Sequence, residues 1–154
     1  MKVTSKSVRT VKMGATCSTH ARTDVKVRDV ELIVDEPLAR GGTNMGFSPT
    51  ETFMASLIGC TNVIINSIAH KMGVEIANMN IEIDYDFAFL GARVIQEVAL
   101  PFPEVRMTID IKTNATSEQI DKIKEDLARF CPVAKMIRNA GCNIVETWAV
   151  TNIS

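Results

Sequence analysis

One long apolar segment with a defined start and end constrains the fold more than any other part of the chain. Ser48-Pro49-Thr50-Glu51 is typical of a helix start, because Ser48 suits the N-cap, Pro49 suits the first helical position and Glu51 can close a capping box. Gly73 suits the residue at which the helix ends. Apolar residues recur between these points at helical spacing and surround most of the helix. One chain of 154 residues offers little to cover such a helix, so we expect a homodimer built around it.

Size and charge exclude several classes of partner. A chain of 154 residues that is 46% hydrophobic predicts a single domain over residues 1–154, which buries roughly 68 to 70% of its unfolded surface. The net charge of -1 provides no basic surface for nucleic acid or an anionic membrane. The N-terminus lacks an apolar signal core, and polar residues interrupt the long helix, so we expect a cytoplasmic protein without a membrane span.

The remaining patterns predict an α+β fold. Before the long helix, alternating β-branched residues indicate strands at Lys2–Met13 and Asp24–Val34 around a turn at Cys17–Thr23, followed by a loop rich in glycine and proline from Asp35 to Phe47. After the helix, alternation and caps predict a strand at Val74–Phe89, a turn at Leu90–Ala92, a return strand at Arg93–Leu100 that resumes at Val105–Lys112, helices at Thr116–Arg129 and Cys131–Asn139, and a last strand at Asn143–Val150.

Two of the four cysteines lie in settings that suggest chemistry. Cys60 lies inside the long apolar helix, where a thiol is shielded from water, although a small buried hydrophobe is the simpler explanation there. Cys131 precedes Pro132 at a helix start, where free backbone N–H groups favour a thiolate. If the fold brings these thiols together, they form a redox couple. Cys17 and Cys142 match no motif, so we interpret both as structural or incidental.

The cysteine and histidine pattern predicts neither a metal site nor a cofactor. In a cytoplasmic protein all four cysteines should rest as thiols, and any disulfide would be transient. The chain has no Cys-x-x-Cys and only two histidines, which argues against structural zinc.

Two separated motifs together resemble one family. The first runs from Gly41 to Thr61 (Gly-Gly-Thr-Asn-Met-Gly-Phe-Ser-Pro-Thr-Glu-Thr-Phe-Met-Ala-Ser-Leu-Ile-Gly-Cys-Thr) and follows Asp35-Glu-Pro. The second is Cys131-Pro-Val-Ala-Lys-Met. In this order they resemble the OsmC/Ohr family of thiol-dependent peroxidases, and the similarity covers about Val25 to Val150.

The resemblance implies an OsmC-like fold in which antiparallel sheets pack around a long central helix, and two subunits swap strands with active sites at their interface. It implies that Cys60 attacks an organic hydroperoxide, that Cys131 is the resolving thiol, and that an external dithiol of lipoyl or thioredoxin type reduces the resulting disulfide. Hydrogen peroxide is a candidate second substrate.

The resemblance also implies an arginine beside Cys60 and a glutamate that holds it. A peroxidatic thiol in mid-helix needs a nearby cation, because its reference pKa is about 8.5. Arg22 matches best and Arg28 is second, while an exposed charge at a strand end explains either equally well; Arg40 is a third candidate, which could equally cover the pocket entrance. Glu51 matches the glutamate, and its place in a capping box explains its spacing equally well.

One departure from the family pattern concerns the residue after the first cysteine. Well-characterised organic hydroperoxide reductases have an aromatic residue there, which helps to wall an apolar substrate pocket, whereas this chain has Thr61. A second hypothesis therefore stays open, in which the protein is a non-peroxidatic one that binds a small apolar or thiol-bearing metabolite at the dimer interface.

Overall fold

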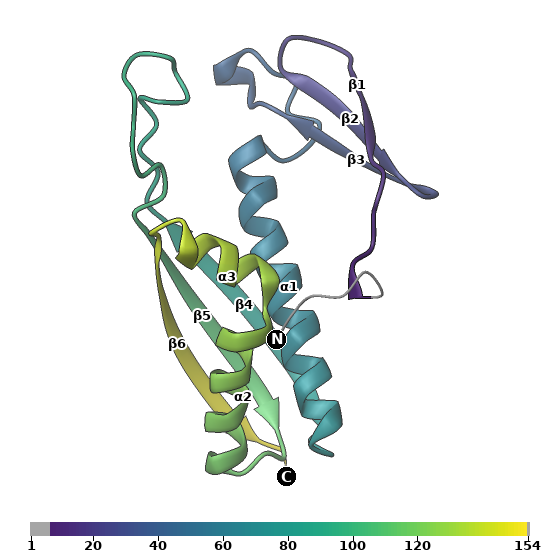
Figure 1. Ribbon diagram of the computed structural model, residues 1–154, viewed down its shortest axis with the longest axis vertical. Helices are drawn as coiled ribbons and strands as arrows, with labels where there is room; N and C mark the ends of the chain where they lie inside the picture. The colour runs from purple at the N-terminus through teal and green to yellow at the C-terminus, as the bar shows by residue number, and fades with distance from the viewer. Residues whose placement is uncertain (1–6, 154) are drawn as a thin grey trace. The chain divides into compact units, whose positions relative to one another are not determined.

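The computed structural model describes residues 7–153, and these form two compact units. The N-terminal unit ends at Phe53, and the C-terminal unit begins at Met54. Three helices and two small sheets make up the chain (Figure 1), which confirms the predicted α+β class.

The N-terminal unit contains a three-stranded antiparallel sheet in the order β1-β2-β3. Its strands are β1 (Gly14–Cys17), β2 (Arg22–Val27) and β3 (Val30–Asp35). A loop with a short 3-10 helix, η2 (Leu38–Arg40), then leads to the start of the long helix α1 (Pro49–Lys71).

The predicted strands of this unit are partly wrong. Residues 7–13, the described part of the expected Lys2–Met13 strand, contain no strand; residues 2–6 of that prediction lie outside the described residues. The expected strand Asp24–Val34 is a hairpin instead, with Arg28 and Asp29 as its turn between the paired Val27 and Val30. Arg28 adopts a left-handed φ of 54°. Glycine or asparagine at such a position would have indicated a turn, but arginine does not. The alternating pattern therefore predicted one continuous strand in place of two strands and a turn.

Both predicted ends of α1 are confirmed. The backbone N–H of Ser48 donates to the Glu51 carboxylate at 2.8 Å, and the backbone N–H of Glu51 donates to Ser48 Oγ at 3.4 Å, which is a capping box. At the other end, Gly73 takes the left-handed backbone that terminates helices, with φ of 66°.

The polarity of α1 does not by itself exclude a membrane span, contrary to the sequence-based expectation. By length and composition the 23 residues Pro49–Lys71 pass the test for a helix that could cross a membrane. The core helix of a soluble protein passes the same test, and 33% of the most apolar window is buried within the protein. That the protein acts without a membrane stays a prediction.

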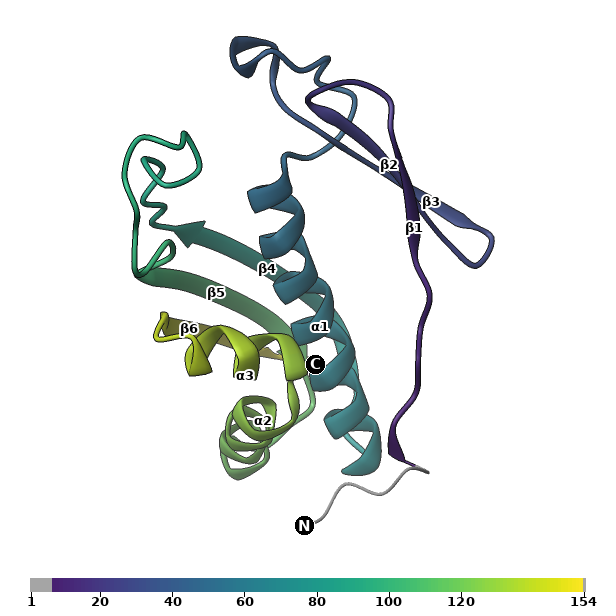
Figure 2. The same cartoon turned by 45° about the horizontal axis from the view of Figure 1, so that its top comes forward.

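The C-terminal unit is a three-stranded sheet in the order β4-β5-β6, with helices on one face (Figures 1 and 2). Its elements after α1 are β4 (Ile76–Tyr85), β5 (Glu104–Thr113), α2 (Ser117–Phe130), α3 (Pro132–Asn139) and β6 (Asn143–Asn152). β4 and β5 are antiparallel, as predicted, but β5 and β6 are parallel. Parallel neighbours need a crossover, and the α2–α3 segment provides it.

The segment between β4 and β5 does not form the expected return strand. Residues 86–103 make turns and irregular structure in place of a strand at Arg93–Leu100. Phe87 and Phe102 stack at the base of this segment, with ring centroids 5.1 Å apart. Pro101 and Pro103 bracket Phe102, and proline cannot donate a ladder hydrogen bond, so pairing with β4 stops there.

Burial is concentrated in the C-terminal unit. Every buried hydrophobic side chain of the described residues lies at or after Met54. The core joins α1 and α2 to the inner face of the sheet, with Leu57, Ile109 and Ile123 all fully buried.

Candidate active site: a thiol pair between two helices

The first thiol of the site lies in the middle of α1. Cys60 is half-buried and packs against the core of the C-terminal unit. The neighbouring Gly59 is exposed, and a Cβ atom at that position would meet nothing within 4 Å. The surface of α1 at Gly59 is therefore open among the described residues.

The second thiol lies where one helix ends and the next begins. Cys131 is the C-cap of α2, where its backbone N–H donates to the Leu127 carbonyl at 3.0 Å, and it is also the N-cap of α3. Pro132 occupies the first position of α3, as the sequence predicted. The Ala134 backbone N–H donates to the Cys131 sulfur at 3.5 Å. The cap therefore fixes the direction of this side chain.

The fold brings the two predicted thiols together. Cys131 Sγ donates a hydrogen bond to Cys60 Sγ across 3.2 Å, although 71 positions separate them in the sequence. All four cysteines are free thiols in this structure. A disulfide bond is about 2.05 Å long, so the two sulfurs are in contact but not bonded.

The two thiols differ in burial, in the opposite sense to the sequence-based prediction. Cys131 is fully buried, whereas Cys60, on the supposedly shielded helix, is the more exposed of the two. Burial raises the pKa of Cys131 above its ordinary value; the Ala134 N–H opposes this shift, and the hydrogen bond to Cys60 adds a smaller rise. The helix-start N–H groups do act as expected and lower the pKa of Cys131, but desolvation outweighs them and the net shift is upward. The Cys131 thiol is the donor of the hydrogen bond to Cys60.

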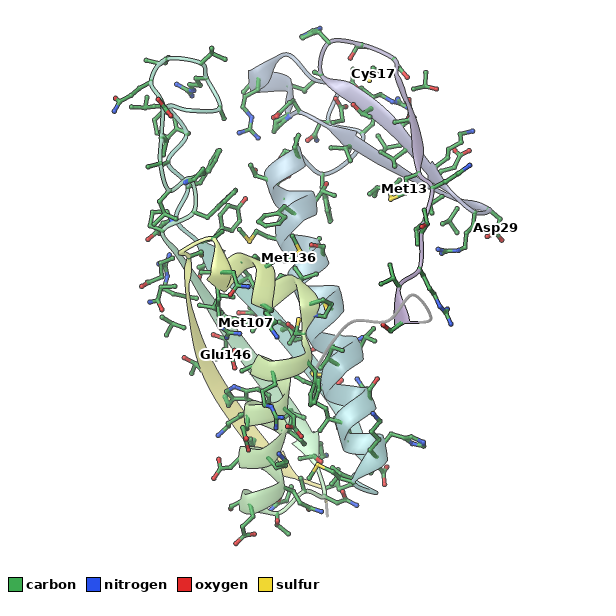
Figure 3. All side chains as sticks on the ribbon, viewed as in Figure 1. Met13, Cys17, Asp29, Met107, Met136 and Glu146 are labelled. Carbon is green, nitrogen blue, oxygen red and sulfur yellow. The ribbon has the colours of Figure 1, made fainter. Side chains whose placement is uncertain are left out.

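The residue after the first cysteine belongs to the core. Thr61 is fully buried, and its hydroxyl donates to the Met107 sulfur at 3.7 Å. Figure 3 shows Met107 on β5, behind the helices. The side chain at position 61 faces this strand, so an aromatic ring there would have to displace the core.

Glu51 performs the capping role that its spacing predicts. Its pKa is lowered, chiefly by the backbone N–H of Ser48, next by the Ser48 side chain, and to a smaller extent by the positive charge of Arg40. Arg40 itself pairs with Glu36, with Nε 2.7 Å from Oε2. Arg40 is therefore a cation whose field reaches Glu51 within the N-terminal unit.

The other two candidate arginines have different surroundings. Arg22 forms a two-pronged ion pair with Asp24, with Nη2–Oδ1 at 2.7 Å and Nε–Oδ1 at 3.0 Å. Ser18 also donates to the Asp24 carboxylate. Arg28 lies in the turn of the β2–β3 hairpin. The support of the Cys60 thiolate by Arg22, Arg28 or Arg40 stays a prediction.

A buried carboxylate that we had not predicted organises the loop before α1. Asp35 is fully buried at the end of β3, and its Oδ2 accepts from the Thr43 backbone, the Thr43 hydroxyl and the Met45 backbone at 3.0, 2.6 and 3.0 Å. These bonds lower its pKa, the Thr43 hydroxyl most strongly. The chain folds so tightly here that a Cβ at Gly42 would lie 1.7 Å from the Glu36 carbonyl oxygen. An aspartate directly before a loop with paired glycines was the available signal.

The other two cysteines, Cys17 and Cys142, differ from each other in exposure. Cys17 is exposed at one end of the N-terminal sheet, and Asp29 marks the opposite end (Figure 3). Cys142 is buried, and burial raises its pKa. Among residues 7–153, no three His, Cys, Asp or Glu side chains gather as a metal-binding group.

Comparison with known families decides the relationship of this chain. The family described as OsmC-like protein matches residues 42–146, which include the end of the loop, the long helix and both thiols of the pair. The chain belongs to the OsmC-like family.

Some relatives of this OsmC-like chain carry names connected with peroxide. The organic hydroperoxide resistance protein-like 1 of Staphylococcus saprophyticus is 26% identical over 121 residues, which cover 77% of this chain and 79% of that protein. The crystal structure of an OsmC-like protein from Mycoplasma pneumoniae superimposes with a TM-score of 0.77 at 12% identity, covering 93% of this chain and 98% of that one. An organic hydroperoxide resistance protein from Elizabethkingia anophelis gives a TM-score of 0.64 at 20% identity, covering 96% and 99%. The fold is therefore the OsmC-like fold, and the family relation supports a role connected with peroxide.

Proposed function

We propose that this OsmC-like protein is a thiol peroxidase that reduces organic hydroperoxides, with hydrogen peroxide as a second substrate, through Cys60 and Cys131. The observation that carries the proposal is the 3.2 Å contact between the two sulfurs in a family that includes organic hydroperoxide resistance proteins. Two helices deliver these thiols from distant parts of the sequence to one point. A pair of structural cysteines has no need of this contact.

The first step uses the more exposed thiol. The Cys60 thiolate attacks the terminal oxygen of the hydroperoxide, an S–O bond forms, and the O–O bond breaks. The released alkoxide takes up a proton and leaves as an alcohol, so two electrons pass from sulfur to the peroxide. Cys60 becomes a sulfenic acid. Cys131 retains its proton during this step because burial raises its pKa, which suits a resolving thiol and not an attacking one.

In the second step, Cys131 resolves the Cys60 sulfenic acid. The Cys131 sulfur attacks the Cys60 sulfur, the S–S bond forms as the S–O bond breaks, and the hydroxyl leaves as water with the Cys131 proton. An external dithiol of lipoyl or thioredoxin type then restores both thiols by exchange and leaves as its own disulfide. Resting thiols of this kind suit a reducing cytoplasm, where we place the protein.

Single substitutions at each cysteine test the proposal. With excess dithiol reductant, the wild type should consume cumene or tert-butyl hydroperoxide catalytically. Cys60→Ser should abolish turnover, since the nucleophile is lost. Cys131→Ser should react once and then stall as a sulfenic acid or over-oxidise. Cys142→Ser and Cys17→Ser are the matched controls and should keep turnover.

One outcome would favour the second hypothesis. If the wild type and Cys60→Ser consume peroxide equally slowly with several reductants, the peroxidase proposal is wrong. A non-peroxidatic protein that binds a small metabolite would then be the better account.

A further inference from the structure

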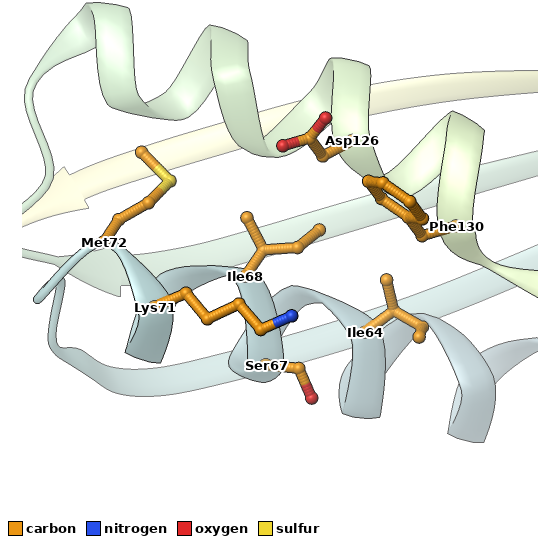
Figure 4. Close-up of a pocket in the computed structure, with 7 residues that line it drawn as sticks. All are labelled: Ile64, Ser67, Ile68, Lys71, Met72, Asp126 and Phe130. Carbon is orange, nitrogen blue, oxygen red and sulfur yellow. The ribbon is translucent and has the colours of Figure 1, made fainter.

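A groove between α1 and α2 lies on the same helix surface as Cys60. It has a volume of about 380 Å³, within the range of about 300 to 1,000 Å³ that is typical of small-molecule sites. From α1 it is lined by Ile64, Ser67, Ile68, Lys71 and Met72, and from α2 by Asp126 and Phe130 (Figure 4). All of these residues belong to the C-terminal unit.

The walls of the groove are apolar. Ile64, Ile68 and Met72 line it from the α1 side, and Phe130 lines it from the α2 side (Figure 4). Phe130 remains 58% exposed although it lies beside the fully buried Cys131. An exposed aromatic ring against an apolar groove offers contact area to an alkyl chain.

One uncompensated positive charge lies at the groove. The Lys71 side chain runs back along α1 toward Ser67 (Figure 4). Asp126 is already paired with Lys122 and Arg129, at 3.0 and 3.4 Å. Within residues 7–153, Lys71 forms no ion pair. A lysine in the last turn of a helix suits the helix dipole, but that alone does not direct its amine along an apolar groove.

We propose that this groove binds a single-chain anionic amphiphile, an alkyl carboxylate, with the chain along Ile64, Ile68 and Phe130 and the carboxylate at Lys71. The ligand needs no peroxide group, so the site is distinct from the chemistry at the sulfurs. It is nevertheless adjacent to them, because Ile64 lies one turn after Cys60 and Phe130 directly precedes Cys131. A bound chain would therefore touch both helices that hold the thiol pair.

Calorimetric titration with hexanoate, octanoate and decanoate tests the apolar part of the proposal. Saturable binding of one ligand per chain should strengthen by up to about fourfold per added methylene until the groove is full. Octanoate should bind better than octanol, and octylammonium should bind least. Absence of saturable binding, or equal binding of octanoate and octylammonium, would overturn the proposal.

Two pairs of variants test the residues. Lys71→Gln should weaken octanoate binding roughly two- to fivefold, as expected for a partly exposed ion pair, and leave octanol binding unchanged. Lys112→Gln, on the exposed outer face of β5, is the control. Ser67→Phe should fill the groove and abolish binding of both ligands, whereas Ser67→Ala should bind normally, with circular dichroism confirming that each is folded.

The experiment separates this proposal from the peroxidase. Cys60→Ser should bind octanoate as the wild type does, whether or not the thiols turn over peroxide. If Lys71→Gln alters the oligomeric state in sedimentation and not the octanoate affinity, the groove belongs to a second copy of the chain and the ligand proposal is overturned.

Discussion

Each of the two units is stabilised internally by a different kind of interaction. The C-terminal unit packs helices against a sheet through buried side chains such as Leu57, Ile109 and Ile123. In the described part of the N-terminal unit the only buried side chains are Asp35 and Ser48, which are both polar and both accept a hydrogen bond from a backbone N–H.

The contrast shows which unit can specify its own fold. Apolar burial is the dominant favourable term in folding, and the described N-terminal unit buries no apolar side chain fully. Its order rests on strand pairing, ion pairs and the Asp35 loop. We infer that this unit needs apolar cover from outside itself, which agrees with the homodimer that we propose.

The largest expected effect is the difference in stability loss when one apolar side chain is truncated in each unit. Ile109→Ala removes a fully buried side chain and should lower the free energy of unfolding by about 2 to 5 kcal/mol. Leu32→Ala, at a side chain 46% exposed on β3, should change it by less than about 0.5 kcal/mol. Urea denaturation measures both. Equal losses would mean that the N-terminal unit has an apolar core of its own or that Leu32 is covered in the assembly.

The sequence predicted some parts of the structure better than others. The three helices, the capping box of Ser48 and Glu51, the cap at Cys131 and the pairing of β4 with β5 follow from local patterns, because caps and helical periodicity act between near neighbours. The turn at Arg28 and the parallel partner of β6 were missed, because alternation identifies a strand but neither its end nor its neighbour.

At the thiol pair, the two cysteines themselves were easier to predict than how deeply each is buried. The motifs indicated Cys60 and Cys131, and the structure brings their sulfurs into contact. Their relative burial was missed, because it depends on how α2 and α3 meet the sheet. Asp35 was quoted in a motif without a role, since the backbone groups that it binds only converge after folding.

A charge on the exposed side of α1 should break the proposed dimer. Val63 is 59% exposed in the single chain, so Val63→Asp should leave the subunit folded. If α1 packs against a second copy, the variant should raise the dimer dissociation constant at least about tenfold, because an unpaired charge is costly to bury. Sedimentation at low micromolar concentration measures this, with Thr147→Asp on exposed β6 as the control. A wild type that sediments as a folded monomer would contradict the dimer.

Acid should loosen the N-terminal loop before it affects the core. The folded-state pKa of Asp35 lies below its ordinary value, so its stabilising contribution is present above the unfolded pKa of about 3.9 and is lost as the pH falls through the folded value. Exchange protection of the Thr43 and Met45 amides should therefore fall between about pH 5 and pH 2. Asp35→Asn should show weaker protection that does not vary with pH. Protection of the wild type that stays constant over this range would contradict the role of Asp35.

Three arginine variants test which arginine supports the Cys60 thiolate. If Arg22 supports the Cys60 thiolate, Arg22→Ala should slow alkylation of Cys60 at neutral pH several-fold, because a nearby cation favours the charged thiol. Arg28→Ala should leave the rate unchanged. Arg40→Ala is the informative third variant, since the Arg40 charge reaches Glu51. A loss confined to Arg40→Ala would transfer the role from Arg22 to Arg40, and no change in any variant would remove the arginine from the mechanism.

The thiol pair itself is tested most directly by identifying what one equivalent of tert-butyl hydroperoxide oxidises. We expect the reduced protein to lose two of its four thiols. Peptide mapping by mass spectrometry should find Cys60 linked to Cys131 in the same chain, with Cys17 and Cys142 still reduced. A protein that keeps all its thiols, or that oxidises at Cys17 or Cys142 while Cys60 and Cys131 remain reduced, would contradict the proposed redox couple.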